Sequence, residues 1–318
     1  MGIDIRLERV TCHYGAHLVL DGISWRIEAG SKIGLVGANG AGKSTLLRAI
    51  AGEVVPTSGS IIVAAKRRLG LLSQEPVLCP ERTVWQAALR GDLETLELQS
   101  RLRELEEQMA QPEIYGDSRL FDRIMGQYAR TQQAFEDIDG YRHENRTRGV
   151  LARLGIEAEQ FDQLVGTLSG GEKKLVGLTQ LLVGRCDVLL LDEPDNHLDL
   201  ARKAYLEGLI TAFPGTVVLV SHDRYLLDNT VDIIAEVEDG KLELYDGNYT
   251  CYAVEKDLRR LQAERRYHSQ QRQITHLEAS IARFEQWARE QDSAHAARQA
   301  RSRRKMLERM DELPNPKG

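Results

Sequence analysis

The stretch GANGAGKS at residues 37–44 decides how this sequence folds. It follows an apolar run at residues 33–36 that predicts a strand, and it precedes residues 44–50, whose composition predicts a helix. Its glycines let backbone amides converge on phosphate oxygens, and the helix adds about half a positive charge at its N-terminus. Lys43 can neutralise the outer phosphates, and the Ser44 hydroxyl can reach a magnesium ion. The stretch therefore predicts a site for nucleotide phosphates, with a glycine-rich turn beside an incidental lysine as the alternative.

A second apolar run, residues 188–191, ends in the acidic pair Asp192 and Glu193. A carboxylate at the end of a buried strand beside a phosphate loop can hold magnesium through water. Many strands end in acidic residues, so this pair carries little weight by itself.

A third motif, LSGGE at residues 168–172, lies about twenty residues before the acidic pair. With it the sequence strongly resembles the ATP-binding cassette (ABC) ATPases. The resemblance implies an α/β fold, a P-loop NTPase cassette with an antiparallel β subdomain, and magnesium-dependent hydrolysis of ATP to ADP and phosphate. In that family LSGGE, the signature, faces ATP held by an opposing cassette, and the start of a helix is a suitable anion site. We therefore expect ATP and Mg²⁺ as cofactors and a second cassette, in a longer chain or in a dimer, as partner.

The resemblance also implies roles for individual residues. Glu193 would be the base or water-orienting carboxylate, Gln74 the magnesium and water sensor, and His222 the contact to the γ-phosphate. The implied nucleotide-binding residues are Tyr14, which would stack on adenine, and Gly37, Asn39, Gly40, Ala41, Gly42, Lys43, Ser44, Thr45, Ser169, Gly170 and Gly171. The implied magnesium ligands are Ser44, Gln74 and Asp192. Taken singly, Tyr14 could be a half-buried strand residue, Gln74 an exposed loop amide, and His222 a capping or core histidine.

One branch of the family, ABC-F, is the most similar. LDEPDNHLD at residues 191–199 closely resembles the LDEPTNHLD string of ABC-F proteins, which act on ribosomes instead of transporting solutes. SHDRYLLD at 221–228 and YDGNY at 245–249 also resemble ABC-F segments. Asp195 replaces the usual Thr, and Leu175 lies where an Arg usually follows the signature. These departures affect the expected tuning of hydrolysis and cassette contacts, and not nucleotide binding.

The spacing of apolar residues predicts how the chain is organised. Strands are expected at residues 3–10, 22–28, 59–63, 69–72, 188–191 and 216–220, with a β-hairpin at 233–237 and 241–245. The segment from Cys251 to Met310 contains neither Pro nor Gly and shows a coiled-coil-like seam. The predicted domains are a cassette at 1–250 with a helical arm insertion at 93–144 that breaks at 112–116, a helical linker hairpin at 251–312 that bends near 290–293, and a tail at 313–318.

The linker hairpin is predicted to be basic near its end. Between residues 295 and 309 there is a single acid, Glu308, and six basic residues, which are Arg298, Arg301, Arg303, Arg304, Lys305 and Arg309. The segment resembles the linker between the two cassettes of an ABC-F chain, whose tip approaches transfer RNA on the ribosome. Its charge suits contact with RNA phosphates, and a solvated helix face is the alternative. The resemblance therefore implies the ribosome, with ribosomal RNA and transfer RNA, as partner.

Composition limits the remaining choices. The 318 residues include 42 Lys and Arg and 48 Asp and Glu, a net charge of -6, so the chain is not a polycation. The four scattered cysteines form no CxxC pair, so we expect a protein of the reducing cytoplasm. No apolar run approaches the roughly 20 residues of a membrane helix, so we expect no membrane insertion. With one glycine loop and one signature, we expect half of a two-cassette protein. The rival functions are the ATPase subunit of a membrane transporter and a non-catalytic module gated by nucleotide.

Overall fold

The computed structural model describes residues 2–90, 93–111, 118–196, 198–290 and 294–310. The chain divides into two units, Met1–Thr250 and Cys251–Gly318. The predicted break of the arm at 112–116, the tail at 313–318, most of the predicted bend at 290–293 and one residue of the LDEPDNHLD string lie outside the described residues.

Within the described residues the strands form two sheets. A three-stranded antiparallel sheet has the order β2-β1-β4, and a six-stranded sheet has the order β5-β6-β7-β3-β8-β9, in which only β9 is antiparallel to its neighbour. The strands are β1 (Ile3–Tyr14), β2 (His17–Glu28), β3 (Lys32–Val36), β4 (Ser58–Val63), β5 (Leu69–Leu72), β6 (Val188–Asp192), β7 (Thr216–Val220), β8 (Ile233–Glu238) and β9 (Lys241–Asp246). The predicted α/β cassette with an antiparallel β subdomain is confirmed.

The first two strands are longer than their sequence predicts. Strands were expected at 3–10 and 22–28, whereas β1 and β2 form one long hairpin that turns after Tyr14. The register shifts between Leu7 and Val10, where Arg9 has a φ of 46°. Because a bulge moves the following side chains to the opposite face, the alternation that marks a strand is interrupted there.

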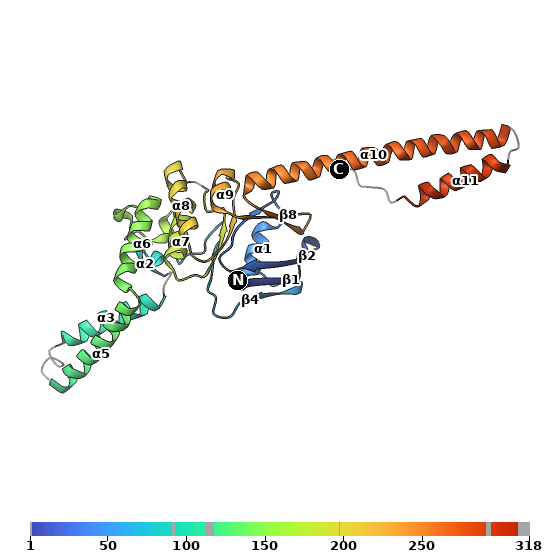
Figure 1. Ribbon diagram of the computed structural model, residues 1–318. Helices are drawn as coiled ribbons and strands as arrows, with labels where there is room; N and C mark the ends of the chain where they lie inside the picture. Colours follow the sequence, from blue (N-terminus) through green and yellow to red (C-terminus); the bar gives the residue numbers. More distant parts are fainter. Residues whose placement is uncertain (1, 91–92, 112–117, 197, 291–293, 311–318) are drawn as a thin grey trace. The chain divides into compact units, whose positions relative to one another are not determined.

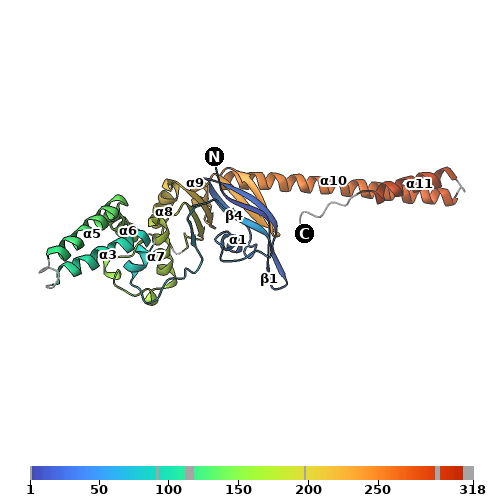
Figure 2. The same ribbon diagram turned by 90° about the horizontal axis from the view of Figure 1, so that it is seen from below.

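The helices of the first unit pack around the six-stranded sheet and extend from it as an arm. They are α1 (Lys43–Ile50), α2 (Val84–Leu89), α3 (Leu93–Met109), α5 (Ser118–Asp137), α6 (Gly140–Leu154), α7 (Gly170–Val183), α8 (Leu200–Ala212) and α9 (Arg224–Thr230). The arm helices α3 and α5 lie side by side in both views (Figures 1 and 2) and bury Leu105 and Phe135. Helix α1 shares one apolar core with both sheets, which fixes the start of α1 relative to the strands.

The second unit is a helical hairpin. Helix α10 (Tyr249–Glu290) begins at the end of the first unit, and α11 (Ala294–Glu308) runs beside its far part (Figure 1). An ion pair of 2.5 Å joins Arg304 to Glu285, and the Arg303 guanidinium lies 4.4 Å from the Phe284 ring centroid. These contacts hold α11 against α10.

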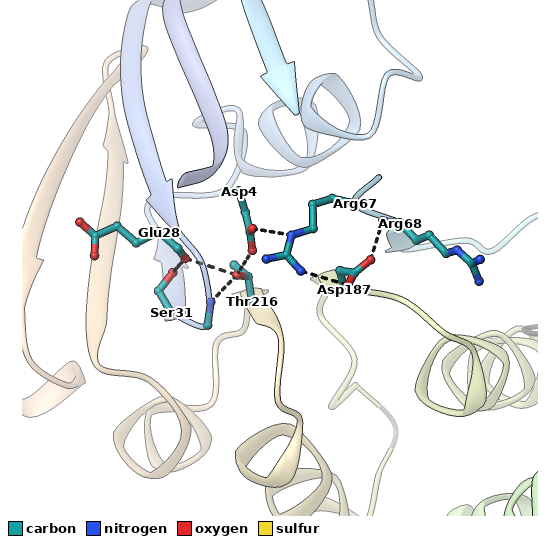
Figure 3. A network of polar contacts seen from close by, with 8 residues as sticks. Asp4, Glu28, Ser31, Arg67, Arg68, Asp187 and Thr216 are labelled. Carbon is teal, nitrogen blue, oxygen red and sulfur yellow. Dashed lines mark hydrogen bonds and ion pairs between the residues drawn. The ribbon is translucent and has the colours of Figure 1, made fainter. Parts of the chain in front are cut away.

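A polar network ties the antiparallel sheet to the parallel one (Figure 3). Asp4 of β1 is buried, forms an ion pair of 2.8 Å with Arg67, and accepts a hydrogen bond of 2.6 Å from Thr216 at the start of β7. Arg67 also pairs with Asp187, directly before β6. The network therefore holds the edge where the parallel strands begin, and it leaves their carboxyl ends for a site at the opposite edge.

Candidate nucleotide site

The glycine loop follows the carboxyl end of β3 and leads into α1. Gly37, Gly40 and Gly42 all have positive φ, which favours glycine. The Lys43 ammonium donates hydrogen bonds of 2.8 Å to the Gly37 carbonyl and 2.9 Å to the Ala38 carbonyl. Ala38, Asn39 and Gly40 are exposed, Ala41, Ser44 and Thr45 are half-buried, and Gly42 is buried. The predicted loop residues therefore form one continuous loop, and the Lys43 side chain is hydrogen-bonded to the backbone of that loop.

Asp192 ends β6 next to this loop. Its carboxylate is buried and accepts a hydrogen bond from the Ser44 hydroxyl, and its Oδ1 has no hydrogen-bond partner in the described part of the chain. Burial raises the pKa of Asp192, and the bond from Ser44 lowers it. Burial lowers the pKa of Lys43, and the nearby negative charges of Glu193 and Asp192 act in the opposite direction. A buried carboxylate oxygen without a partner, beside a hydroxyl, fits a hard cation such as Mg²⁺, which takes oxygen ligands.

Glu193 is held in a fixed position just beyond β6. Its φ is 51°, and its amide donates a 2.9 Å bond to the Val220 carbonyl of β7. Its Oε2 accepts hydrogen bonds of 3.0 Å from Gln74 Nε2 and 2.6 Å from Asn196 Nδ2. His222 Nε2 lies 3.5 Å from Oε1 of the same carboxylate. The structure thus brings together the three predicted catalytic residues Glu193, Gln74 and His222, from the ends of three neighbouring parallel strands.

Ser169 caps the helix α7 that follows the signature. Its hydroxyl accepts a 3.3 Å bond from the Glu172 amide, while its own amide and hydroxyl donate to Glu172 Oε2 at 2.9 and 2.7 Å. The hydrogen bond that the Ser169 backbone amide donates is the main reason that the pKa of Glu172 is lowered. At Gly170 an added Cβ would meet no described atom within 4 Å. The start of α7 is therefore capped by side-chain hydrogen bonds and has open space at Gly170.

The signature and the glycine loop border different cavities of this chain. Gly170 and Gly171 line one cavity, and Ser44 and Asp192 line another. Gln74 borders both. Of these two cavities in the described part of the chain, the signature glycines therefore line the one that Ser44 of the glycine loop does not border.

Tyr14 lies away from these contacts. It ends β1 opposite His17 and is 52% exposed. The strand β2 continues to Val19 and Leu20, whose side chains would be 2.9 Å from a Cβ at Gly42. Tyr14 therefore lies near the turn of a hairpin that abuts the loop, and its contact with adenine stays a prediction.

Comparison with known proteins agrees with this geometry. The family profile described as "ABC transporter" matches residues 20–196, and a second profile with the same description matches residues 235–318. The chain is 35% identical over 297 residues to the "Probable ATP-binding protein YheS" of Escherichia coli (strain K12), covering 93% of this chain and 43% of that protein. It is 34% identical over 307 residues to the "Energy-dependent translational throttle protein EttA" of Mycobacterium tuberculosis (strain H37Rv), covering 96% and 51%. A solved ATP-binding subunit of an ABC transporter superposes with a TM-score of 0.54 at 18% identity, over 76% of this chain and 90% of that one, which supports the fold.

The chain belongs to the ABC-F family of ABC ATPases. The predicted family and the predicted ATPase cassette are confirmed. The chain spans about half the length of the curated relatives it matches. Among the described residues, no helix combines the length and apolar character needed to cross a membrane.

Three residues of this ABC-F site were not among the predicted catalytic, nucleotide-binding or magnesium-binding residues. Asn196 makes the shortest hydrogen bond to Glu193, although the sequence shows it only as one letter of a family string. Asp195 is buried and bonded to Ser221, so it links the segment after β6 to the segment after β7. Lys174 is buried on α7 beside an equally basic neighbour, Lys173, that is only half-buried. The helical spacing of apolar residues in α7 indicates that only one of the two lysines lies on the buried face, but nothing in the sequence shows which groups Lys174 contacts.

Proposed function

We propose that the chain is the ATP-hydrolysing half of a two-cassette ABC-F protein that acts on the ribosome in the cytoplasm. One observation supports the catalytic part. Gln74 and Asn196 hold the Glu193 carboxylate by hydrogen bonds, and the preceding residue, Asp192, has a buried carboxylate oxygen without a hydrogen-bond partner among the described residues. The name of EttA, a translational throttle, supports the ribosomal part.

The residues of the loop side bind and orient the triphosphate. Amides of residues 37–45 and the N-terminus of α1 would take the phosphate oxygens, and Lys43 would exchange two carbonyl partners for phosphate oxygens. Ser44, Asp192 and Gln74 would hold Mg²⁺, which supplies charge neutralisation to the outer phosphates. Tyr14 would lie on the adenine face.

The residues around Glu193 act on the attacking water. Glu193 would orient that water and accept its proton, while Gln74 and Asn196 keep the carboxylate in place. His222, whose Nε2 lies 3.5 Å from Glu193 Oε1, would donate a hydrogen bond to the γ-phosphate. Hydrolysis of this kind depends mostly on positioning and on stabilising charge, which the short fixed contacts supply.

A second cassette would close the site. The start of α7 is capped, open at Gly170, and lines a cavity apart from the loop, so it suits the triphosphate of another cassette. Ribosomal RNA and transfer RNA would be contacted by the arm and by the linker hairpin. ATP would draw the cassettes together, and hydrolysis would release them.

Replacing the proposed base tests the catalytic part. Glu193→Gln keeps the hydrogen-bonding shape and removes the charge that accepts a proton, so phosphate release should fall about a hundredfold or more while ATP binding persists. Phosphate release at saturating ATP and Mg²⁺, together with calorimetric ATP binding, measures both effects. The matched control is Glu97→Gln at an exposed position of α3. Phosphate release from Glu193→Gln at the rate of the parent would refute the assignment.

Sedimentation with ribosomes tests the second part. Because Glu193→Gln should trap the ATP-bound state, it should pellet with ribosomes in the presence of ATP and stay in the supernatant without it. Pelleting that is independent of ATP, or co-sedimentation with membranes instead, would contradict action on the ribosome.

A further inference from the structure

A second buried cation lies at the catalytic edge of the sheet. Lys174 is the fifth residue of α7, and only 5% of it is exposed. In the described part of the chain its ammonium makes no hydrogen bond and no ion pair within 4 Å. An ammonium group loses much of its hydration when it is buried, so a lysine in this state needs compensation from its surroundings.

The compensation comes from the carboxylates that follow β6. Burial lowers the pKa of Lys174, and the charges of Glu193, Asp192 and Asp195 act in the opposite direction. Asp192 and Asp195 are 3% and 5% exposed, and each has an Oδ1 without a hydrogen-bond partner among the described residues. Buried carboxylates are unfavourable unless opposite charge is close, so Lys174 and these acids stabilise one another.

Lys174 also borders the same cavity as the two residues that hold Glu193. This cavity, of about 650 Å³, is lined by Lys174, Gln74 and Asn196, together with Gly170 and Gly171 of the signature. Gln74 and Asn196 donate to the same oxygen of Glu193. Lys174 therefore lines the same cavity as the two amide side chains that hold the Glu193 carboxylate in place.

Two other cations lie near the acids, and neither takes over this task during hydrolysis. Lys203 acts on Asp195, but its ammonium is held in a 2.6 Å ion pair with Asp223. The charges of Glu193 and Asp192 also act on Lys43, but the Lys43 ammonium donates hydrogen bonds to the carbonyls of Gly37 and Ala38 in the phosphate loop. When a triphosphate occupies the loop, Lys43 would turn to phosphate oxygens. Besides the Mg²⁺ that Asp192 would hold, Lys174 is then the cation that stays beside Glu193 and Asp192.

We propose that Lys174 is a positioning residue for ATP hydrolysis, whose ammonium balances the carboxylates after β6 and keeps Glu193 in the place where Gln74 and Asn196 hold it. The proposal rests on the role of Glu193 given under Proposed function. It makes α7 a link, inside one cassette, between the signature at its N-terminus and the acid that orients water. A shift of α7 on contact with a partner cassette would move the countercharge of the catalytic acid.

Charge-changing variants test this link. Lys174→Met keeps much of the apolar stem and removes the charge, so we expect kcat to fall about tenfold, the effect of losing one nearby charge partner, with KM for ATP within about twofold. Lys174→Arg should keep most of kcat because it keeps the charge. In Lys174→Met/Asp195→Asn one carboxylate is also neutralised, so most of the lost kcat should return. Loss of packing alone predicts no such recovery.

The control and the remaining outcomes separate this proposal from the one it rests on. Lys241→Met, at an exposed position at the start of β9, removes the same charge away from the site and should keep the kcat of the parent. If Glu193→Gln is inactive but Lys174→Met matches the parent, or if Asp195→Asn restores nothing, the role of Lys174 is refuted and the role of Glu193 stands. If Glu193→Gln is fully active, the proposed function fails first. Should Lys174→Met not yield soluble protein, recovery of solubility by Asp195→Asn supports the charge balance, and its absence overturns it.

Discussion

At the scale of single residues, Gly37 shows how an absent side chain shapes the phosphate loop. Its φ is 146°, a conformation that residues with a Cβ rarely adopt. A Cβ built there would lie 2.3 Å from the Val237 carbonyl oxygen of β8. The loop can therefore follow the end of β3 so closely only with glycine at this position.

Gly37→Ala should abolish ATP binding, because either the loop or β8 has to move to admit the methyl group. Isothermal calorimetry with ATP and Mg²⁺ measures the loss. Gly52→Ala is the matched control, since Gly52 has a φ of 80° but open space around its Cβ position. That variant should lose about 1 kcal/mol of stability and bind ATP normally. A Gly37→Ala protein with the ATP affinity of the parent would show that the loop does not depend on this glycine.

The residues that the sequence located are those whose chemistry lies in a short local pattern. Lys43 and Ser44 follow their glycines directly, and Glu193 follows an apolar strand at the position to which the family resemblance gives the role of the base. Asn196 and Lys174 act through distant partners, and their burial depends on how the segment after β6 and the face of α7 pack. Such long-range packing leaves no local pattern, which is why these two residues were found only in the structure.

At the scale of elements, the short helix α9 depends on its first residue. Asp223 accepts hydrogen bonds from the amides of Tyr225 and Leu226, and it forms a 2.6 Å ion pair with Lys203 of α8. The bond from Lys203 is the main reason that the pKa of Asp223 is lowered, and the same bond raises the pKa of Lys203. This pair thus joins two helices directly beside His222.

The pair predicts how stability depends on pH. Because the folded pKa of Asp223 lies below its usual value of 3.8, the folded state binds fewer protons than the unfolded state in that range. Its contribution is fully present above the unfolded pKa and is lost as the pH falls through the folded one. Asp223→Asn keeps a capping side chain but should cost about 1 kcal/mol near neutral pH, a difference that shrinks toward pH 3.

Urea unfolding of parent and variant at a series of pH values measures that difference. Asp162→Asn, at an exposed position, controls for the change in net charge. A cost of Asp223→Asn that stays constant down to acid pH would exclude the ion pair as its cause.

Element boundaries followed from the sequence where one periodicity runs without interruption. Strands β5 and β7 begin and end at the predicted residues, because a short run of mostly apolar residues marks each of them. The strands β1 and β2 were predicted too short because of the bulge at Arg9, and α8 and α9 were not predicted. Helix α9 has only seven residues, too few for a periodic signal, and it is held by its cap and its ion pair.

At the scale of the whole molecule, charge is distributed unevenly along the chain. The net charge is -6, yet the second unit carries the six basic residues of its last helical segment. The structure divides these six by role. Arg303 stacks on Phe284 and Arg304 pairs with Glu285, so both hold the hairpin together. The side chains of the remaining four are exposed and make no hydrogen bond or ion pair within the described residues, and they belong to Arg298, Arg301, Lys305 and Arg309.

The four exposed residues should therefore carry the proposed binding to RNA. Changing all four to Gln should weaken binding to a labelled RNA stem-loop and reduce the slope of log affinity against log salt by about 0.7 to 0.9 for each phosphate that the variant no longer neutralises. Fluorescence anisotropy across a series of KCl concentrations measures both quantities. Four changes to Gln at positions 259, 260, 265 and 266, all Arg in α10, alter the net charge equally and should leave the slope close to that of the parent. An unchanged slope in the first variant would show that the basic end of the hairpin is a solvated helix face, because a surface that binds phosphates must release counterions when it does so.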